Sequence, residues 1–294
     1  TSVQFAPAMK QWQSPREPLG PVISVWRALP QRATQAIGPF VFLDHLGPMP
    51  SPDFYLPAHP HAGIEVISYL MSGENKHFDS AGFSGTMRAG GAQWINAGRG
   101  ILHAEHIGTD PALPFHSLQI WARLPIAEEN SEPSYHTYEP EDIPQAGADG
   151  YRLRLLSGDF RDTWPAVLPY AGPIVLRHRS VLLHIELAPQ AELEIPLPAG
   201  MELGLYGIAG TTTLNTADAV ILNEGGCVLL GAGTHLRVRN LSDQKAECLL
   251  LGGTPAERPL VFYGPFVFAS RERVRQAEQD FVSGKMGRLD GVPF

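Results

Sequence analysis

The sequence predicts an all-β protein with two domains, and three observations support this prediction. The chain has 294 residues, about twice the length of a typical domain. Its 30 glycines and 27 prolines together make up 57 of the 294 residues, a larger share than the usual value of about 12%. Short apolar runs alternate with Gly-rich turns, which is typical of sandwiches and barrels. Because 44% of the residues are hydrophobic and 18% charged, the composition also argues against disorder and a long coiled coil.

In the first half, each predicted strand ends at a turn. Residues 64–71 are rich in β-branched side chains and stop at Ser72-Gly73. Residues 117–124 alternate between apolar and polar positions, as in a strand with one buried face. The predicted strands of this half are residues 22–26, 64–71, 85–88, 92–96 and 117–124.

The second half repeats this pattern and then changes to a helix. Its predicted strands are residues 181–187, 193–197, 203–208, 219–222, 228–230, 236–238 and 248–251. Ser270 is the predicted N-cap of the helix, and Gly284 suits its C-terminal cap. Between them, Val274, Ala277 and Phe281 have the spacing of an apolar helix face.

An acidic, Pro-rich stretch from residue 126 to residue 150 separates the two halves. We therefore predict an N-terminal domain of residues 1–135, a connection of residues 136–150 and a C-terminal domain of residues 151–294.

Charge and cysteine usage narrow the function classes. The net charge of −8 argues against direct contact with nucleic acid. No signal peptide or membrane-length apolar run is visible, so we expect a cytoplasmic monomer without membrane contact. Cys227 and Cys248 lie in apolar surroundings and are expected to be reduced, although the sequence leaves a disulfide open.

Histidines concentrate in the first half of the chain. Eight of the eleven lie there: His45, His59, His61, His77, His103, His106, His116 and His136. His59-Pro60-His61 places two imidazoles on the same strand face, and His103-Ala104-Glu105 repeats that spacing. Glu65 lies four residues after the first pair. Together these residues predict a site with three imidazoles and one or two carboxylates. Such ligands, with no thiolate, suit Fe, Mn, Ni, Co, Cu or Zn.

The same motifs resemble those of the pirin family, a branch of the cupin superfamily with quercetinase-like members. The matching stretches are residues 42–48 (FLDHLGP), 57–65 (PAHPHAGIE), 93–105 (QWINAGRGILHAE), 118–121 (LQIW) and 263–267 (YGPFV). The resemblance extends from about residue 20 to the C-terminal helix.

This resemblance implies a bicupin, with two face-to-face antiparallel, jelly-roll-like β-barrels and a short C-terminal helix. One metal, most often Fe(II), is then expected in the N-terminal barrel only, held by His59, His61, His103 and Glu105. In many other cupins the carboxylate ligand follows the first histidine pair. Glu65 is therefore either an alternative ligand or a residue that orients an imidazole.

The resemblance implies quercetin 2,3-dioxygenase activity on a flavonol-like substrate with O₂. Glu105 is then both a ligand and the base for the 3-hydroxyl proton. The alternative function is a metal- or redox-sensing protein that regulates a protein partner. An open cavity over the metal would favour the enzyme.

Other residues near the motifs have weaker predictions. Phe42, Phe54 and Trp94 are candidates for an apolar substrate wall, while Trp94 and Gln119 lie on strands that flank the second ligand pair. His45 either lines the pocket or is structural. The remaining histidines are expected to carry no chemistry: His77 and His136 at the surface, His106 on the opposite strand face, and His184 and His235 isolated in a metal-free C-terminal barrel.

Overall fold

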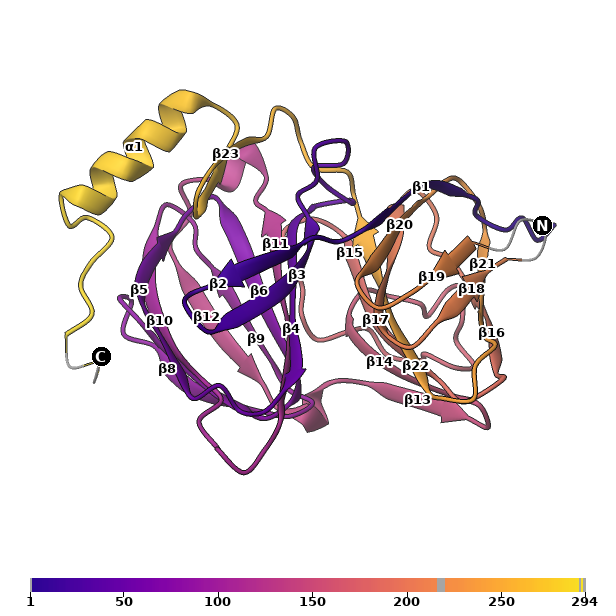
Figure 1. Ribbon diagram of the computed structural model, residues 1–294. Coiled ribbons are helices and arrows are strands. Elements are labelled where there is room, and N and C mark those ends of the chain that lie inside the picture. Colours follow the sequence, from indigo (N-terminus) through magenta and orange to yellow (C-terminus); the bar gives the residue numbers. More distant parts are fainter. Residues whose placement is uncertain (1, 216–219, 291, 293–294) are drawn as a thin grey trace. The chain divides into compact units, whose positions relative to one another are not determined.

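The computed structural model (Figure 1) describes residues 2–215, 220–290 and 292 and confirms the all-β fold. Its strands form two compact units. One unit comprises residues 16–25, 41–142 and 256–294, and the other comprises residues 1–15, 26–40 and 143–255. Below we call them the histidine-rich unit and the C-terminal unit. Among the described residues, no helix combines the length and the apolar composition that a membrane span requires.

Two sheets and a small hairpin build the histidine-rich unit. The larger sheet has the order β12-β9-β6-β11-β4-β3-β2, and the smaller one β5-β10-β7-β8. These strands are β2 (Arg16–Leu19), β3 (Ile23–Leu29), β4 (Phe40–Met49), β5 (Phe54–His61), β6 (Ile64–Ser72), β7 (Glu74–Asp79), β8 (Ser84–Arg88), β9 (Ala92–Asn96), β10 (Ile101–Ile107), β11 (Phe115–Arg123) and β12 (Ser134–Tyr138). The hairpin is β23 (Val261–Tyr263) with β24 (Phe266–Phe268), and two 3₁₀ turns are η1 (Ile126–Glu128) and η2 (Pro140–Asp142).

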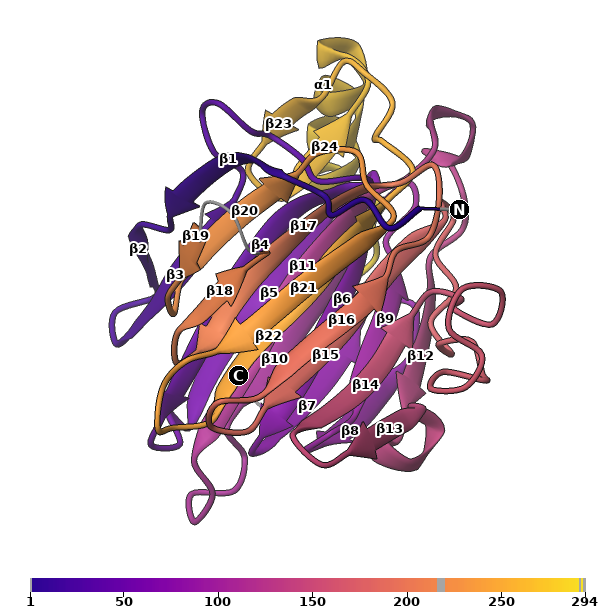
Figure 2. The same cartoon turned by 90° about the vertical axis from the view of Figure 1, so that its right-hand side faces the viewer.

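The C-terminal unit repeats this plan of one larger and one smaller sheet. Their orders are β1-β20-β17-β22-β15-β14-β13 and β16-β21-β18-β19, and Figure 2 shows β22, β15 and β14 side by side. These strands are β1 (Ala8–Gln13), β13 (Gln145–Ala148), β14 (Tyr151–Ser157), β15 (Ser180–Leu187), β16 (Glu192–Pro196), β17 (Glu202–Ala209), β18 (Thr212–Leu214), β19 (Val220–Leu222), β20 (Gly226–Leu230), β21 (His235–Asn240) and β22 (Ala246–Gly253). Residue 219, the predicted start of the strand seen as β19, lies outside the described residues.

Strand β15 shows why the alternating pattern folds in this way. Val181, Leu183, Ile185 and Leu187 all point into one apolar core and are fully buried. Alternate residues of a strand face the same side, so this spacing places these four apolar side chains in that core. Burial of each is worth roughly 1.5–3 kcal/mol.

The ends of the chain join the opposite units from those predicted by the ranges 1–135 and 151–294. Strand β1 pairs with β20 of the C-terminal unit, whereas residues 256–294 belong to the histidine-rich unit. The predicted connection, residues 136–150, contributes to the larger sheet of each unit. In one unit β12 pairs with β9, and in the other β13 pairs with β14. Strand pairing, which the linear pattern does not specify, decides these assignments.

The predicted helix is α1 (Arg271–Val282), which lies beside β23 in Figure 1. Ser270 is its N-cap, and its side chain accepts a hydrogen bond from the Arg273 backbone N–H. Val274 and Ala277 are buried against the hairpin and its neighbours, as predicted. Phe281 is 42% exposed, so the apolar face is shorter than the sequence suggests.

The C-terminal hairpin reaches the strand that carries the first histidine pair. Phe266 forms an isolated parallel bridge with Ala62, directly after His61. Gly63 has a φ of +78°, and a Cβ there would lie 2.0 Å from the Val267 carbonyl oxygen. Only glycine permits this close approach of the two backbones.

Both cysteines are free and buried, as predicted. Burial raises the pKa of the Cys227 and Cys248 thiols, so little thiolate forms near neutral pH. We expect Ellman's reagent to label neither thiol in the native protein within minutes and both after unfolding in guanidinium. Rapid labelling of the native protein would contradict this burial.

Candidate metal centre

Strand β10 brings the two predicted ligand pairs together because it lies between β5 and β7. Where β10 pairs with β5, His103 lies opposite His59. The register then shifts, so Glu105 faces Leu56 on β5 and His77 on β7. The predicted meeting of His59, His61 and His103 therefore follows from one pair of adjacent strands.

The three imidazoles converge on one another through their Nε2 atoms. His103 Nε2 lies 2.7 Å from His59 Nε2 and 3.0 Å from His61 Nε2. Two nitrogens bound to one metal at ~2.1 Å and at right angles would lie about 3.0 Å apart. The spacing and chemistry of these nitrogens therefore fit a first-row divalent ion.

Burial keeps two of these rings in the form that metals bind. It lowers the pKa of His61 and His103 well below the usual histidine value, and the neighbouring His59 adds to both shifts. The Pro265 carbonyl faces His61 and opposes its shift, although Nδ1 has no partner with hydrogen-bond geometry. Neutral imidazole is the metal-binding form.

His59 is oriented by its own strand. Its Nδ1 lies 2.8 Å from the Pro57 carbonyl oxygen, to which an Nδ1–H would donate. That tautomer directs the Nε2 lone pair toward the cluster, as is common for metal-binding histidines.

Glu105 is buried beside the cluster and is supported from the other sheet. Burial raises the pKa of its carboxyl group, which His59, His77 and a hydrogen bond from Gln93 partly offset. Gln93 Nε2 on β9 donates to Glu105 Oε1 at 3.2 Å and also to Ser68 Oγ at 3.2 Å. No pattern along the sequence assigns this role to Gln93, because the contact joins residues of two different sheets.

The expectation that His77 is a surface residue is wrong. Its side chain is 1% exposed, and its donor atom lies within 4.8 Å of donor atoms of His103 and Glu105. His77-Phe78-Asp79 has the same two-residue spacing as the ligand pairs, and this signal could have identified it. His136 is exposed, as predicted.

Aromatic side chains adjoin the cluster, though not all of those predicted. The rings of Trp121 and His61 form a T-shaped pair with centroids 5.1 Å apart, and Phe42 stacks on Trp121 at 3.9 Å. Phe54 instead packs in a separate apolar cluster. Trp94 Nε1 donates to Glu65 Oε1 at 3.1 Å.

The other predicted neighbours have structural partners. Glu65 is fully buried. Among the described residues, it belongs to neither of the two groups of potential metal ligands in the histidine-rich unit. His45 Nε2 lies 2.7 Å from His116 Nε2, and both rings are buried. Gln119 Oε1 accepts a hydrogen bond from Ser68 Oγ at 2.6 Å. His106 pairs with Asp53 at 2.6 Å, apart from the cluster.

The expectation that His184 is isolated is wrong. On β15 and β22, its Nε2 lies 3.2 Å from Glu247 Oε1, and Glu186 completes a third group of potential metal ligands among the described residues. Strand pairing brings Glu247 there from 63 positions along the chain. Lys245 Nζ already lies 3.3 Å from Glu186 and 3.6 Å from Glu247.

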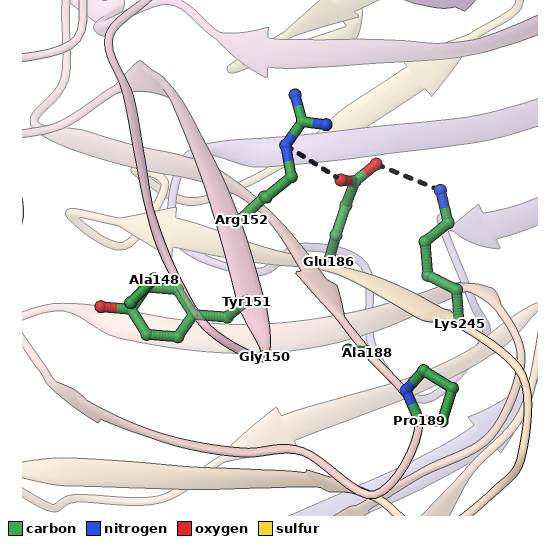
Figure 3. A pocket seen from close by; sticks show the side chains of 8 residues that line it. All are labelled: Ala148, Gly150, Tyr151, Arg152, Glu186, Ala188, Pro189 and Lys245. Carbon is green, nitrogen blue, oxygen red and sulfur yellow. Dashed lines mark hydrogen bonds and ion pairs between the residues drawn. The ribbon is translucent and has the colours of Figure 1, made fainter.

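The same Glu186 lines a hollow of about 330 Å³. Its carboxylate lies between Arg152 and Lys245 (Figure 3). These cations neutralise the carboxylate, so a salt-bridge network explains the group. We assign it no metal.

Comparisons with known proteins agree with this fold. The family model described as Pirin matches residues 22–122, and the one described as Pirin C-terminal cupin domain matches residues 182–287. A quercetin 2,3-dioxygenase from Acinetobacter baumannii, solved by crystallography, has a TM-score of 0.86 and 25% identity, covering 96% of this chain and 99% of that one. The expected architecture of two cupin domains is thereby confirmed.

Two relatives extend the match along the sequence. A pirin-like protein from Solanum lycopersicum is 33% identical over 265 residues, covering 90% of this chain and 87% of the relative. Pirin from Homo sapiens is 32% identical over 266 residues, covering 90% and 88%. This chain therefore belongs to the pirin family.

Proposed function

We propose that this chain is a metal-dependent dioxygenase of the quercetin 2,3-dioxygenase type, which cleaves a flavonol-like substrate with O₂. The observation that carries the proposal is the convergence of three imidazoles beside one buried carboxylate. The similarity to the Acinetobacter enzyme over nearly the whole chain supports this reaction class.

His59, His61, His103 and Glu105 are the residues that we propose as ligands of one divalent metal. We favour Fe(II), and the same donors suit Mn, Ni, Co, Cu or Zn. Bound there, the metal would act as a Lewis acid toward the substrate's oxygens and as a template for O₂.

Glu105 is the residue that we propose to accept the 3-hydroxyl proton of the substrate. Burial makes its carboxylate a better proton acceptor than an exposed one. Because Gln93 donates to Oε1, we assign the proton to Oε2. The Phe42–Trp121 stack beside His61 offers a flat apolar surface for an aromatic ring.

A turnover assay tests this proposal. The apo protein is loaded separately with Fe(II), Mn(II), Co(II), Ni(II) and Cu(II), and quercetin is added in the presence of O₂. We expect loss of the flavonol absorbance with one O₂ consumed and one CO released per substrate. In Glu105→Gln, the rate per bound metal should fall by roughly 10²- to 10⁴-fold, the usual contribution of a general base.

The matched control is His106→Phe, which lies next to Glu105 but pairs with Asp53. It should retain turnover. Absence of turnover with every metal would overturn the enzymatic proposal. Tight metal binding without turnover would instead favour the alternative, a metal-responsive regulator of a protein partner.

A further inference from the structure

A histidine–aspartate pair lies next to the proposed metal centre. His77 Nε2 is 2.7 Å from Asp79 Oδ2, and both side chains are almost completely buried. Asp79 is itself anchored, because its Oδ1 accepts hydrogen bonds from the backbone N–H groups of Ala81 at 2.9 Å and Phe83 at 3.1 Å. The turn after β7 therefore holds this carboxylate in place.

The His77 ring is fixed on its face as well as at its edge. It stacks on Tyr135 with ring centroids 4.5 Å apart and an interplanar angle of 9°. The His103 ring lies 5.4 Å away. Since both an anchored carboxylate and an aromatic face hold it, the ring has little freedom to rotate.

His77 is a close polar neighbour of Glu105, because donor atoms of the two side chains lie within 4.8 Å of each other. The register shift in β10 places Leu56 opposite it on β5, so that neighbouring strand offers an apolar side chain there. On β7 the facing residue is His77. Gln93 holds one carboxylate oxygen from the other sheet. A carboxylate with fewer fixed neighbours would sample more side-chain rotamers.

We propose that His77, anchored by Asp79, is a positioning residue that holds Glu105 in the orientation needed to bind the metal. Nothing in this role requires His77 to bind the metal or the substrate. Partners that orient a metal ligand typically contribute 10- to 100-fold to metal affinity. The inference rests on the proposed metal centre but not on the proposed reaction.

A double-mutant cycle on metal affinity tests this role without any substrate. Apo wild type, His77→Phe, Glu105→Gln and the double variant are titrated with Co(II), and affinity and the visible absorption band are recorded. We expect His77→Phe to weaken Co(II) binding 10- to 100-fold and to shift its band toward that of Glu105→Gln. In the Glu105→Gln background, the same substitution should change affinity by less than about twofold.

The control for this cycle is again His106→Phe, which removes a histidine–aspartate bond of similar length on β10, the strand that carries Glu105. It should leave Co(II) affinity within about twofold of wild type. If His77→Phe does not fold, Asp79→Asn replaces it and should cause a smaller loss in the same direction. An undiminished affinity in the wild-type background would overturn the inference. Equal losses in both backgrounds would also overturn it, because His77 would then act independently of Glu105.

Because the cycle contains no flavonol, its outcome is separate from that of the turnover assay. A coupled loss of Co(II) affinity in a protein that fails to turn over quercetin would support the positioning role and reject the reaction. Normal turnover with no coupling would support the reaction and reject the positioning role.

Discussion

Replacing His103 by alanine is expected to lower the affinity for divalent metal by more than about 100-fold, so that the dialysed protein contains almost none. The Nε2 of this residue lies within 3.0 Å of both other imidazoles, and His103 belongs to both groups of potential ligands in the histidine-rich unit. Even partners outside the ligand set contribute 10- to 100-fold, so removal of a central ligand should exceed that range.

The measurement is metal content per chain after dialysis, combined with a Co(II) titration of the apo protein. His106→Ala is the matched control, since His106 lies on the same strand and pairs with Asp53 instead. Circular dichroism of the apo variant checks that the fold is retained. One metal per chain in His103→Ala would show that the proposed ligand set is wrong.

The second large effect is expected for Glu129→Ala, which should destabilise the protein by about 3–5 kcal/mol. Arg123 is fully buried, and its Nη2 lies 3.1 Å from Glu129 Oε1. Burial lowers the pKa of the Arg123 guanidinium, which shows that its charge is costly in this place. Without Glu129, the guanidinium would remain buried without this ion-pair partner, and only the charge of Glu257 is identified as still favouring its ionised form.

Glu129 also anchors the C-terminal segment to the histidine-rich unit. Its Oε1 accepts a hydrogen bond from the Ala269 backbone N–H at 2.9 Å, and its Oε2 lies 3.6 Å from Arg273 Nε in α1. We therefore expect faster amide hydrogen exchange in α1 of Glu129→Ala. Glu129→Gln keeps an acceptor for Ala269 and should lose less stability.

The free energy of unfolding in urea, measured on the apo protein, checks this prediction. Glu132→Ala is the control, because Glu132 forms an exposed ion pair with Arg99 that should contribute no more than about 1 kcal/mol. A loss below about 1 kcal/mol in Glu129→Ala would show that the buried pair does not hold the segment.

Local patterns were enough to predict about half of the strands and the C-terminal helix. The strands predicted at residues 64–71, 92–96 and 181–187 correspond to β6, β9 and β15. Each has a side-chain pattern that depends only on residues within the strand. Strand β4 was not predicted, because buried polar residues such as Asp44 and His45 obscure its apolar pattern.

The candidate site was predictable to the same extent and for the same reason. Two-residue spacing places His59 with His61, and His103 with Glu105, on shared strand faces. The resemblance to the pirin family then linked the two pairs. Gln93 could not be assigned in this way, because its contact with Glu105 crosses from one sheet to the other.

The sequence by itself determined the β-rich fold, the capped C-terminal helix and the two histidine motifs, since all of these follow from spacing along a short stretch of chain. Only the tertiary structure decided that His77 lies beside Glu105 and that Glu129 meets Ala269, 140 positions later. It also decided which unit each chain end joins. These outcomes depend on strand register and on contacts between distant segments, which no local periodicity specifies.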